Sequence, residues 1–381
     1  MNHRFTIDGS EALEQELERL CKQIVSGVEG IVPRHKLEAI VLGGGYGRGQ
    51  GGVLKTETGD RPYNDLEFYV FLRGNPLLNE HKYGADLREL AESFSSGAGL
   101  HVEFKIDSLA KLRSSPISMF TYDLVAGHRT VLGGDTIFQG CEHHLQAEKI
   151  PLSEATRLLF NRCTGLLLAK ELLGSQKLSL EQGDFIGRNL AKAQLALGDA
   201  VLTVFGQYHW SCPERHRRLS ELAVSELPPL EEVRQHHAAG VAFKLHPRSI
   251  AKPAAEFEKE HREISGLASQ LWLWLESRRL KCEFSSVRDY ALSEGEKCYG
   301  PAGWRNYLLN LRTFGPQAVF DSMAARYPRE RLFNSLPLLL WNGEVSKEPE
   351  VKMRLQRQLR TGASDWAGLV AAYKQIWTSY G

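Results

Sequence analysis

Two acidic residues in alternate positions are the strongest candidates for chemistry in this chain. Asp65 and Glu67 lie in residues 64–71, where polar and apolar residues alternate with the period of a β-strand. Because successive side chains leave a strand on opposite faces, we expect both carboxylates on one face. Mg²⁺ and Mn²⁺ prefer oxygen ligands, and Mg²⁺ is typically held by one or two carboxylates plus substrate phosphates. The pattern favours metal-assisted phosphoryl transfer.

A glycine-rich segment precedes these carboxylates and directly follows the short apolar segment 39–42. Residues 43–52 have the sequence GGGYGRGQGG. Glycine lets a backbone approach a ligand closely and adopt positive φ, and successive N–H groups can bind an anion. We therefore expect this loop to contact phosphate.

Two familiar glycine motifs fit this loop poorly. A dinucleotide-binding Gly-x-Gly-x-x-Gly that starts at Gly45 would require glycine where Gln50 stands, although Gly44, Gly47 and Gly49 permit looser matches. The phosphate-binding Gly-Lys-Ser/Thr sequence does not occur here. What remains is a strand, a glycine loop and a second strand with Asp-x-Glu.

This order resembles the nucleotidyltransferase superfamily built on the DNA polymerase β palm, particularly its small bacterial members and the antibiotic nucleotidyltransferases. Their loop is roughly Gly-Ser-x-Ala-Arg-Gly-x-Ala, followed by Ser-Asp-x-Asp-Leu; residues 44–51 match the first and 64–68 the second. The chain departs from the pattern at Gly45, which replaces serine, and at Glu67, which replaces the second aspartate. The gap between the motifs is also longer than usual, which we interpret as a hairpin inserted around 56–60.

The resemblance also implies a third carboxylate. Residues 100–107 alternate as a strand, with Glu103 and Asp107 in the polar row. Because Glu103 follows the Asp-x-Glu strand after one predicted helix, it takes the position of the superfamily's third carboxylate, which completes the metal site and acts as a general base. Asp107 is the alternative.

The implied fold class is α+β. A polymerase-β-like palm, a mixed sheet with helices, would span residues 1–150, and an all-α helical bundle would span 151–381. Within the palm we predict helices near 8–27 and 83–94 and a further strand at 128–132.

The resemblance assigns roles to further residues. Gly44, Gly45 and Gly49 would offer backbone to the nucleotide phosphates. Arg48 would support the loop or neutralise charge. Lys192, on a predicted helix of the second domain, would hold the triphosphate; the alternative is that it is a solvent-facing helix charge.

Composition limits the partners. The chain has 381 residues, of which 47 are Lys or Arg and 46 are Asp or Glu. This balance argues against coating a long nucleic acid. The six cysteines form no Cys-x-x-Cys pair, and neither a secretion signal nor a long apolar run occurs, so we expect reduced thiols, a cytoplasmic location and no membrane partner.

The leading hypothesis is a nucleotidyltransferase that uses Mg²⁺ or Mn²⁺ to transfer a nucleoside monophosphate from a nucleoside triphosphate, ATP first among them. The acceptor would be a hydroxyl of a small molecule or a protein, and pyrophosphate would leave. The alternative is a regulatory sensor that binds nucleotide on the same palm with little turnover, which the missing serine suggests. The base, the acceptor and the oligomeric state are left open.

Overall fold

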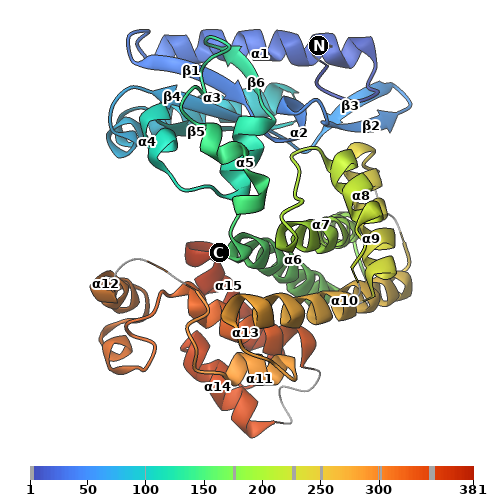
Figure 1. Ribbon diagram of the computed structural model, residues 1–381, viewed down its shortest axis with the longest axis vertical. Coiled ribbons are helices and arrows are strands. Elements are labelled where there is room, and N and C mark those ends of the chain that lie inside the picture. The colour runs from blue at the N-terminus through green and yellow to red at the C-terminus, as the bar shows by residue number, and fades with distance from the viewer. Residues whose placement is uncertain are drawn as a thin grey trace. The chain divides into compact units, whose positions relative to one another are not determined.

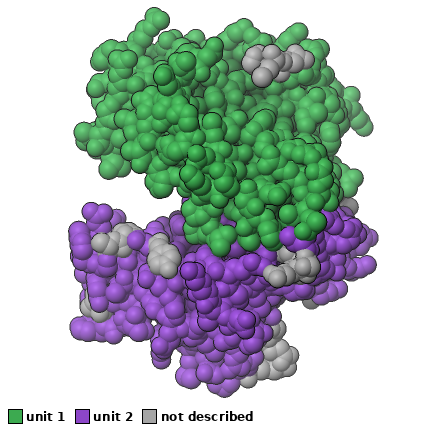
Figure 2. Space-filling model, viewed as in Figure 1, with its two compact units in different colours: residues 1–154, 201–223, 237–249 green, residues 155–200, 224–236, 250–381 purple. Residues whose placement is uncertain are grey.

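The chain folds into two compact units (Figures 1 and 2). The structure is a computed structural model that describes residues 4–98, 100–174, 177–224, 229–248, 252–298, 300, 303–342 and 348–381. Unit 1 consists of residues 1–154, 201–223 and 237–249, and unit 2 of residues 155–200, 224–236 and 250–381. The sequence placed one boundary after residue 150, whereas the chain returns to unit 1 twice after its first exit.

Unit 1 is built on a small mixed sheet with the strand order β5-β4-β1-β6. Strand β1 pairs antiparallel with β4 and with β6, while β4 and β5 run parallel. The strands are β1 (Leu37–Leu42), β4 (Asp65–Leu72), β5 (His101–Asp107) and β6 (Arg129–Leu132). A separate hairpin of β2 (Gly52–Thr56) and β3 (Gly59–Tyr63) confirms the predicted insertion.

Helices cover both faces of the four-stranded sheet. Helices α1 (Glu11–Ile31) and α3 (Pro76–Ala98) pack on the face that carries Leu66, Phe68 and Val70. Helices α4 (Leu109–Ser114) and α5 (Met119–Ala126) pack on the other face, against Tyr69 and Phe71. The alternation along β4 therefore divides its side chains between two cores. The remaining elements of unit 1 are α2 (Gly44–Gly47), η1 (Glu142–Leu145), η2 (Ala147–Lys149) and α8 (Cys212–Glu221).

The predicted N-terminal helix is confirmed as α1, with different ends. The helix begins at Glu11 instead of near residue 8, with Ser10 as its N-cap, because the Ser10 side chain accepts a hydrogen bond from the Leu13 N–H. The helix continues past Gly27 to Ile31, since Val28 extends the buried stripe into the core.

Among its described residues, unit 2 contains helices and their connections and no strand. Trp272 and Phe333 lie at its centre and contact each other, with ring centroids 5.9 Å apart. Among the described helices, three contain residues of both units: α6 (Leu152–Leu173), α7 (Leu180–Val204) and α9 (Leu230–Leu245). The others are α10 (Ala254–Leu280), α11 (Val287–Leu292), α12 (Gly303–Phe314), η3 (Pro316–Phe320), α13 (Arg329–Trp341), α14 (Pro349–Leu359) and α15 (Trp366–Tyr380).

The structure is thus a mixture of helices and a small mixed sheet with a helical C-terminal region, in line with the α+β class. Assignment to the polymerase β palm stays a prediction. Among the described helices, none combines the length and the apolar character that crossing a membrane requires.

Candidate active site

Strands β4 and β5 bring the predicted carboxylates to one face of the sheet. In the parallel register Glu67 is opposite Glu103, and Asp65 is opposite His101. Paired residues on neighbouring strands lie about 4.8 Å apart and point to the same side. Glu67 and Glu103 are therefore direct neighbours, and Asp65 lies one pleat earlier on the same face, the face that α4 and α5 cover further along.

A lysine lies between the two glutamates. The Nζ of Lys105 is 3.2 Å from Oε2 of Glu103 and 3.8 Å from Oε2 of Glu67. The side chains of Glu67 and Glu103 remain 29% and 42% exposed, so ligands from solvent can reach both. Lys105 belongs to the same polar row of 100–107 as Glu103, and no role was predicted for it. Its position two residues after Glu103 indicated that both side chains share one face of the strand. The register between β4 and β5 then places Lys105 near Glu67 as well.

Tyr69 orients one of the carboxylates. Its hydroxyl donates a hydrogen bond of 3.0 Å to Oε2 of Glu67, and its ring lies 5.6 Å from the Nζ of Lys105. Burial, and after it the charge of Glu67, raises the pKa of Tyr69 well above the usual range for a phenol. Tyr69 therefore stays protonated and acts as a donor to Glu67.

The arrangement of these carboxylates can be compared with what a bound metal ion requires. Within the described part of the chain, no group of three or more His, Cys, Asp and Glu side chains is arranged to hold a metal ion. Asp65, Glu67 and Glu103 share a face but do not gather into one such group. Two facing, partly exposed carboxylates do fit a hard cation that takes its other ligands from water and phosphate. Glu67 and Glu103 are the residues that would hold it.

Gly44 lies beside these carboxylates. The Gly43 N–H donates a hydrogen bond of 2.9 Å to the Glu67 carbonyl, which fixes the start of the glycine loop to β4. Gly44 has φ of +60°, a conformation that favours glycine, and a Cβ atom there would lie 3.7 Å from the Glu67 carboxyl carbon. The loop backbone thus borders the site at Gly44.

Gly45 and Gly49, the other two glycines predicted to bind phosphate, lie close to backbone oxygens of neighbouring segments. A Cβ atom on Gly45 would lie 3.1 Å from the Gln50 carbonyl oxygen, so a side chain at this position would require a small shift of that backbone. Gly49 has φ of +71°, and a Cβ atom there would lie 3.0 Å from the Arg4 carbonyl oxygen. Both positions shape the loop.

Tyr46, which the sequence analysis did not single out, connects the loop to the hairpin. Its buried hydroxyl lies 2.7 Å from the Gly52 carbonyl oxygen and accepts a hydrogen bond of 2.7 Å from the Tyr63 N–H. The Gly51 N–H donates to the Phe5 carbonyl at 3.0 Å. The loop is therefore held on two sides.

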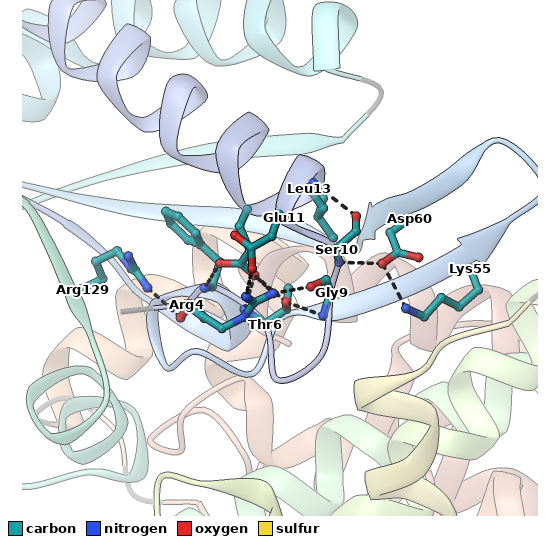
Figure 3. Close-up of polar contacts among 11 residues, drawn as sticks. Arg4, Thr6, Gly9, Ser10, Glu11, Leu13, Lys55, Asp60 and Arg129 are labelled. Carbon is teal, nitrogen blue, oxygen red and sulfur yellow. Dashed lines mark hydrogen bonds and ion pairs between the residues drawn. The ribbon is translucent and has the colours of Figure 1, made fainter. Parts of the chain in front are cut away.

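The N-terminal segment joins the same region to the hairpin and to β6 (Figure 3). Asp60 Oδ2 on β3 accepts hydrogen bonds from the Ser10 N–H at 2.7 Å and from Lys55 Nζ at 3.0 Å. Arg129 on β6 donates to the Arg4 carbonyl at 2.7 Å. No local pattern indicated these contacts, because they mostly join residues far apart in the sequence.

Arg48 points into unit 1 and forms a buried ion pair. Its Nη1 is 3.0 Å from Oδ2 of Asp123 on α5, and only 9% of its side chain is exposed. The same Asp123 oxygen accepts a hydrogen bond from the Tyr208 hydroxyl at 3.2 Å, and Arg215 donates to that hydroxyl at 2.6 Å. Of the two roles predicted for Arg48, this geometry favours support of the loop.

Two further residues predicted for the site are Lys192 and Asp107. Lys192 is exposed on α7 and belongs to unit 2, whereas the carboxylates belong to unit 1, so its phosphate-binding role stays a prediction. Asp107, at the far end of β5, accepts hydrogen bonds from the Ser108 N–H at 2.8 Å and from Lys111 Nζ at 3.0 Å. These contacts favour Glu103 over Asp107 as the third carboxylate.

An exposed aromatic ring adjoins the site. Phe120 at the start of α5 is 43% exposed, and its ring centroid is 5.5 Å from that of Tyr69. A half-exposed ring next to charged groups is a surface on which a planar base can stack. No sequence pattern set Phe120 apart from other apolar residues.

Comparison of the chain with protein-family models, with curated proteins and with solved structures finds no match.

Proposed function

We propose that this chain is a metal-dependent nucleotidyltransferase that transfers a nucleoside monophosphate from a nucleoside triphosphate to a hydroxyl group. The proposal rests on one observation: Glu67 and Glu103 face each other across parallel strands, next to a glycine in the left-handed region. ATP is the first candidate donor, and the hydroxyl belongs to a small molecule or a protein.

Each residue of the site has a separate role in the proposed reaction. Glu67 and Glu103 would hold the divalent ion, with Asp65 on the same face as a further ligand. A bound Mg²⁺ neutralises phosphate charge and orients the α-phosphate. Tyr69 keeps the Glu67 carboxylate in position through its hydrogen bond. The backbone around Gly44 and the ammonium group of Lys105 offer favourable contacts to phosphate oxygens.

The chemical step needs a group that accepts a proton, and it needs the nucleotide to be aligned with the acceptor hydroxyl. Glu103 accepts the proton of the acceptor hydroxyl, whose oxygen bonds to the α-phosphorus while the bond to pyrophosphate breaks. Phe120 stacks on the base and fixes the nucleotide.

Release of pyrophosphate tests this proposal. Purified protein would be incubated with Mg²⁺, each of the four ribonucleoside triphosphates and a panel of hydroxyl acceptors. We expect Glu67→Gln to lower turnover by about 100-fold or more, because it removes a charge that would hold the cation in the transition state. Glu57→Gln, in the exposed hairpin turn, is the matched control and should keep full turnover. Equal turnover of Glu67→Gln and wild type would rule out the assignment.

The second candidate is a nucleotide sensor with little or no turnover. Lys105 favours it, since its ammonium group already neutralises part of the charge of the two glutamates that a cation would need. Equilibrium binding of the same nucleotides separates the candidates. Tight binding without pyrophosphate release under any acceptor condition supports the sensor, and release that depends on Glu67 supports the transferase.

A further inference from the structure

Strand β5 is an open edge of the sheet in unit 1. It ends the strand order, and among the described residues no strand pairs with its outer side. An open groove of about 840 Å³ runs between this edge and α3. An exposed edge presents unpaired N–H and C=O groups to any strand that can align with them.

The outward backbone groups of β5 can be identified. The Val102 N–H donates to the Ser95 hydroxyl of α3 at 2.9 Å, so it points away from β4. Because successive residues in a strand direct these groups to alternate edges, Phe104 and Ile106 also present their N–H and C=O groups outward. The Val102 N–H is already bonded to Ser95, so the groups available for pairing are the Val102 C=O and the N–H and C=O groups of Phe104 and Ile106.

The sequence of β5 is complementary to itself when reversed. With Phe104 opposite Phe104 of the partner subunit, His101 is opposite Asp107, Val102 opposite Ile106, and Glu103 opposite Lys105. Outward residues pair only with outward residues, so the hydrogen bonding agrees with this register, with the exchange of Ser95 for Ile106 of the partner subunit at the Val102 N–H. Pairing centred on Glu103 or on Lys105 would instead place like charges opposite each other, which is unfavourable.

We propose that two copies of this chain associate through antiparallel pairing of their β5 strands, centred on Phe104. The two sheets then form one continuous sheet, and each Glu103 is opposite Lys105 of the partner subunit. The twofold axis is perpendicular to the sheet, so the Glu67–Glu103 faces of the two copies lie on the same side. The inference does not depend on the proposed catalytic function, because molecular mass is its readout.

Charge reversal tests the pairing. Analytical ultracentrifugation should give about twice the monomer mass of 42.8 kDa for the wild type. Glu103→Lys and Lys105→Glu each place like charges across both symmetric pairs and should weaken the dimer at least tenfold. The double variant Glu103→Lys with Lys105→Glu restores opposite charges and should restore the dimer. Glu18→Lys on α1, which breaks an exposed ion pair with Lys22, is the control and should leave the mass unchanged.

Cross-linking tests the register itself. In a Cys282→Ser background, which removes the exposed cysteine, Glu103→Cys and Lys105→Cys chains are mixed and oxidised. The directly opposed pair matches disulfide geometry, so the mixture should cross-link and each variant alone should cross-link far less. Folding of each variant is checked by circular dichroism. A wild-type protein that stays monomeric at about 100 μM, or single reversals that dimerise as well as wild type, would overturn the proposal.

Discussion

Lys105 determines what the Glu67–Glu103 pair can do. Its ammonium group contacts both carboxylates and lies over the Tyr69 ring, so the positive charge that a cation would supply is already present in part. Two partly exposed carboxylates with one lysine form a site whose cation affinity depends on displacing that lysine. Under the proposed function, this one side chain therefore bears on the choice between catalysis and sensing.

Replacing Lys105 with methionine should increase the affinity for Mg²⁺. The change removes a competing charge within 4 Å of both carboxylates while keeping an unbranched apolar stem. Because the site is exposed and screened, we expect a modest effect, a fall in the Mg²⁺ dissociation constant of about tenfold. Isothermal titration with Mg²⁺ measures it. Lys111→Met, on α4 after the end of β5, should leave the affinity unchanged, and an unchanged affinity in Lys105→Met would contradict competition.

Close backbone contacts leave no room for a side chain at one glycine of the loop, Gly47. A Cβ atom on Gly47 would lie 2.1 Å from the Leu42 carbonyl oxygen, at the end of β1. Gly44, by contrast, has ordinary contact distances at its Cβ position and only the disfavoured positive φ. The loop thus contains one glycine that the fold needs for space and another that borders the site.

Alanine at these two positions should therefore differ in effect. Gly47→Ala forces strand β1 and the loop apart and should lower the free energy of unfolding by about 2–4 kcal/mol. Gly44→Ala should cost only about 1–2 kcal/mol, the strain of an L-residue at positive φ. Urea denaturation measures both. Gly30→Ala, where a Cβ atom in α1 meets nothing within 4 Å, is the control and should not destabilise the protein. A Gly47→Ala variant as stable as wild type would show that the loop can relax.

At the scale of the whole molecule, each unit has its own core and its own buried charges. In unit 2, Lys297 is 1% exposed, and its Nζ donates to the Ser293 carbonyl at 3.1 Å and to the Asn334 side chain. Burial lowers the pKa of Lys297 from 10.5 to about 7. A proton is therefore released from the folded state at a lower pH than from the unfolded state.

The stability of the protein should rise with pH because of this lysine. Between about pH 7 and the unfolded-state pKa of 10.5 the unfolded chain binds one proton more at Lys297, so the free energy of unfolding gains up to about 1.4 kcal/mol per pH unit. Lys297→Met should remove this part of the slope. Denaturation curves from pH 7 to 10 compare the two proteins, with Lys259→Met on the exposed side of α10 as control. Parallel slopes for wild type and Lys297→Met would contradict the burial of a titrating ammonium group.

Local patterns predicted several elements of unit 1. Alternation along 64–71 and 100–107 predicted strands β4 and β5, apolar spacing predicted α1, and the length of the intervening segment indicated the hairpin β2–β3. Periodicity is a property of residues close together in the sequence, so it can be recognised from the sequence alone. For the same reason it placed Asp65 and Glu67 on one face.

Only the tertiary structure decided how these pieces combine. The parallel register places Glu103 opposite Glu67 and Lys105 beside both, and the folded chain buries Arg48 against Asp123, 75 residues away. It also returns residues 201–223 and 237–249 to unit 1. Pairing between strands and between distant charges is selected by the packing of the whole unit, which no segment encodes alone. The sequence by itself therefore determined which groups are available for chemistry, and the fold determined which of them meet.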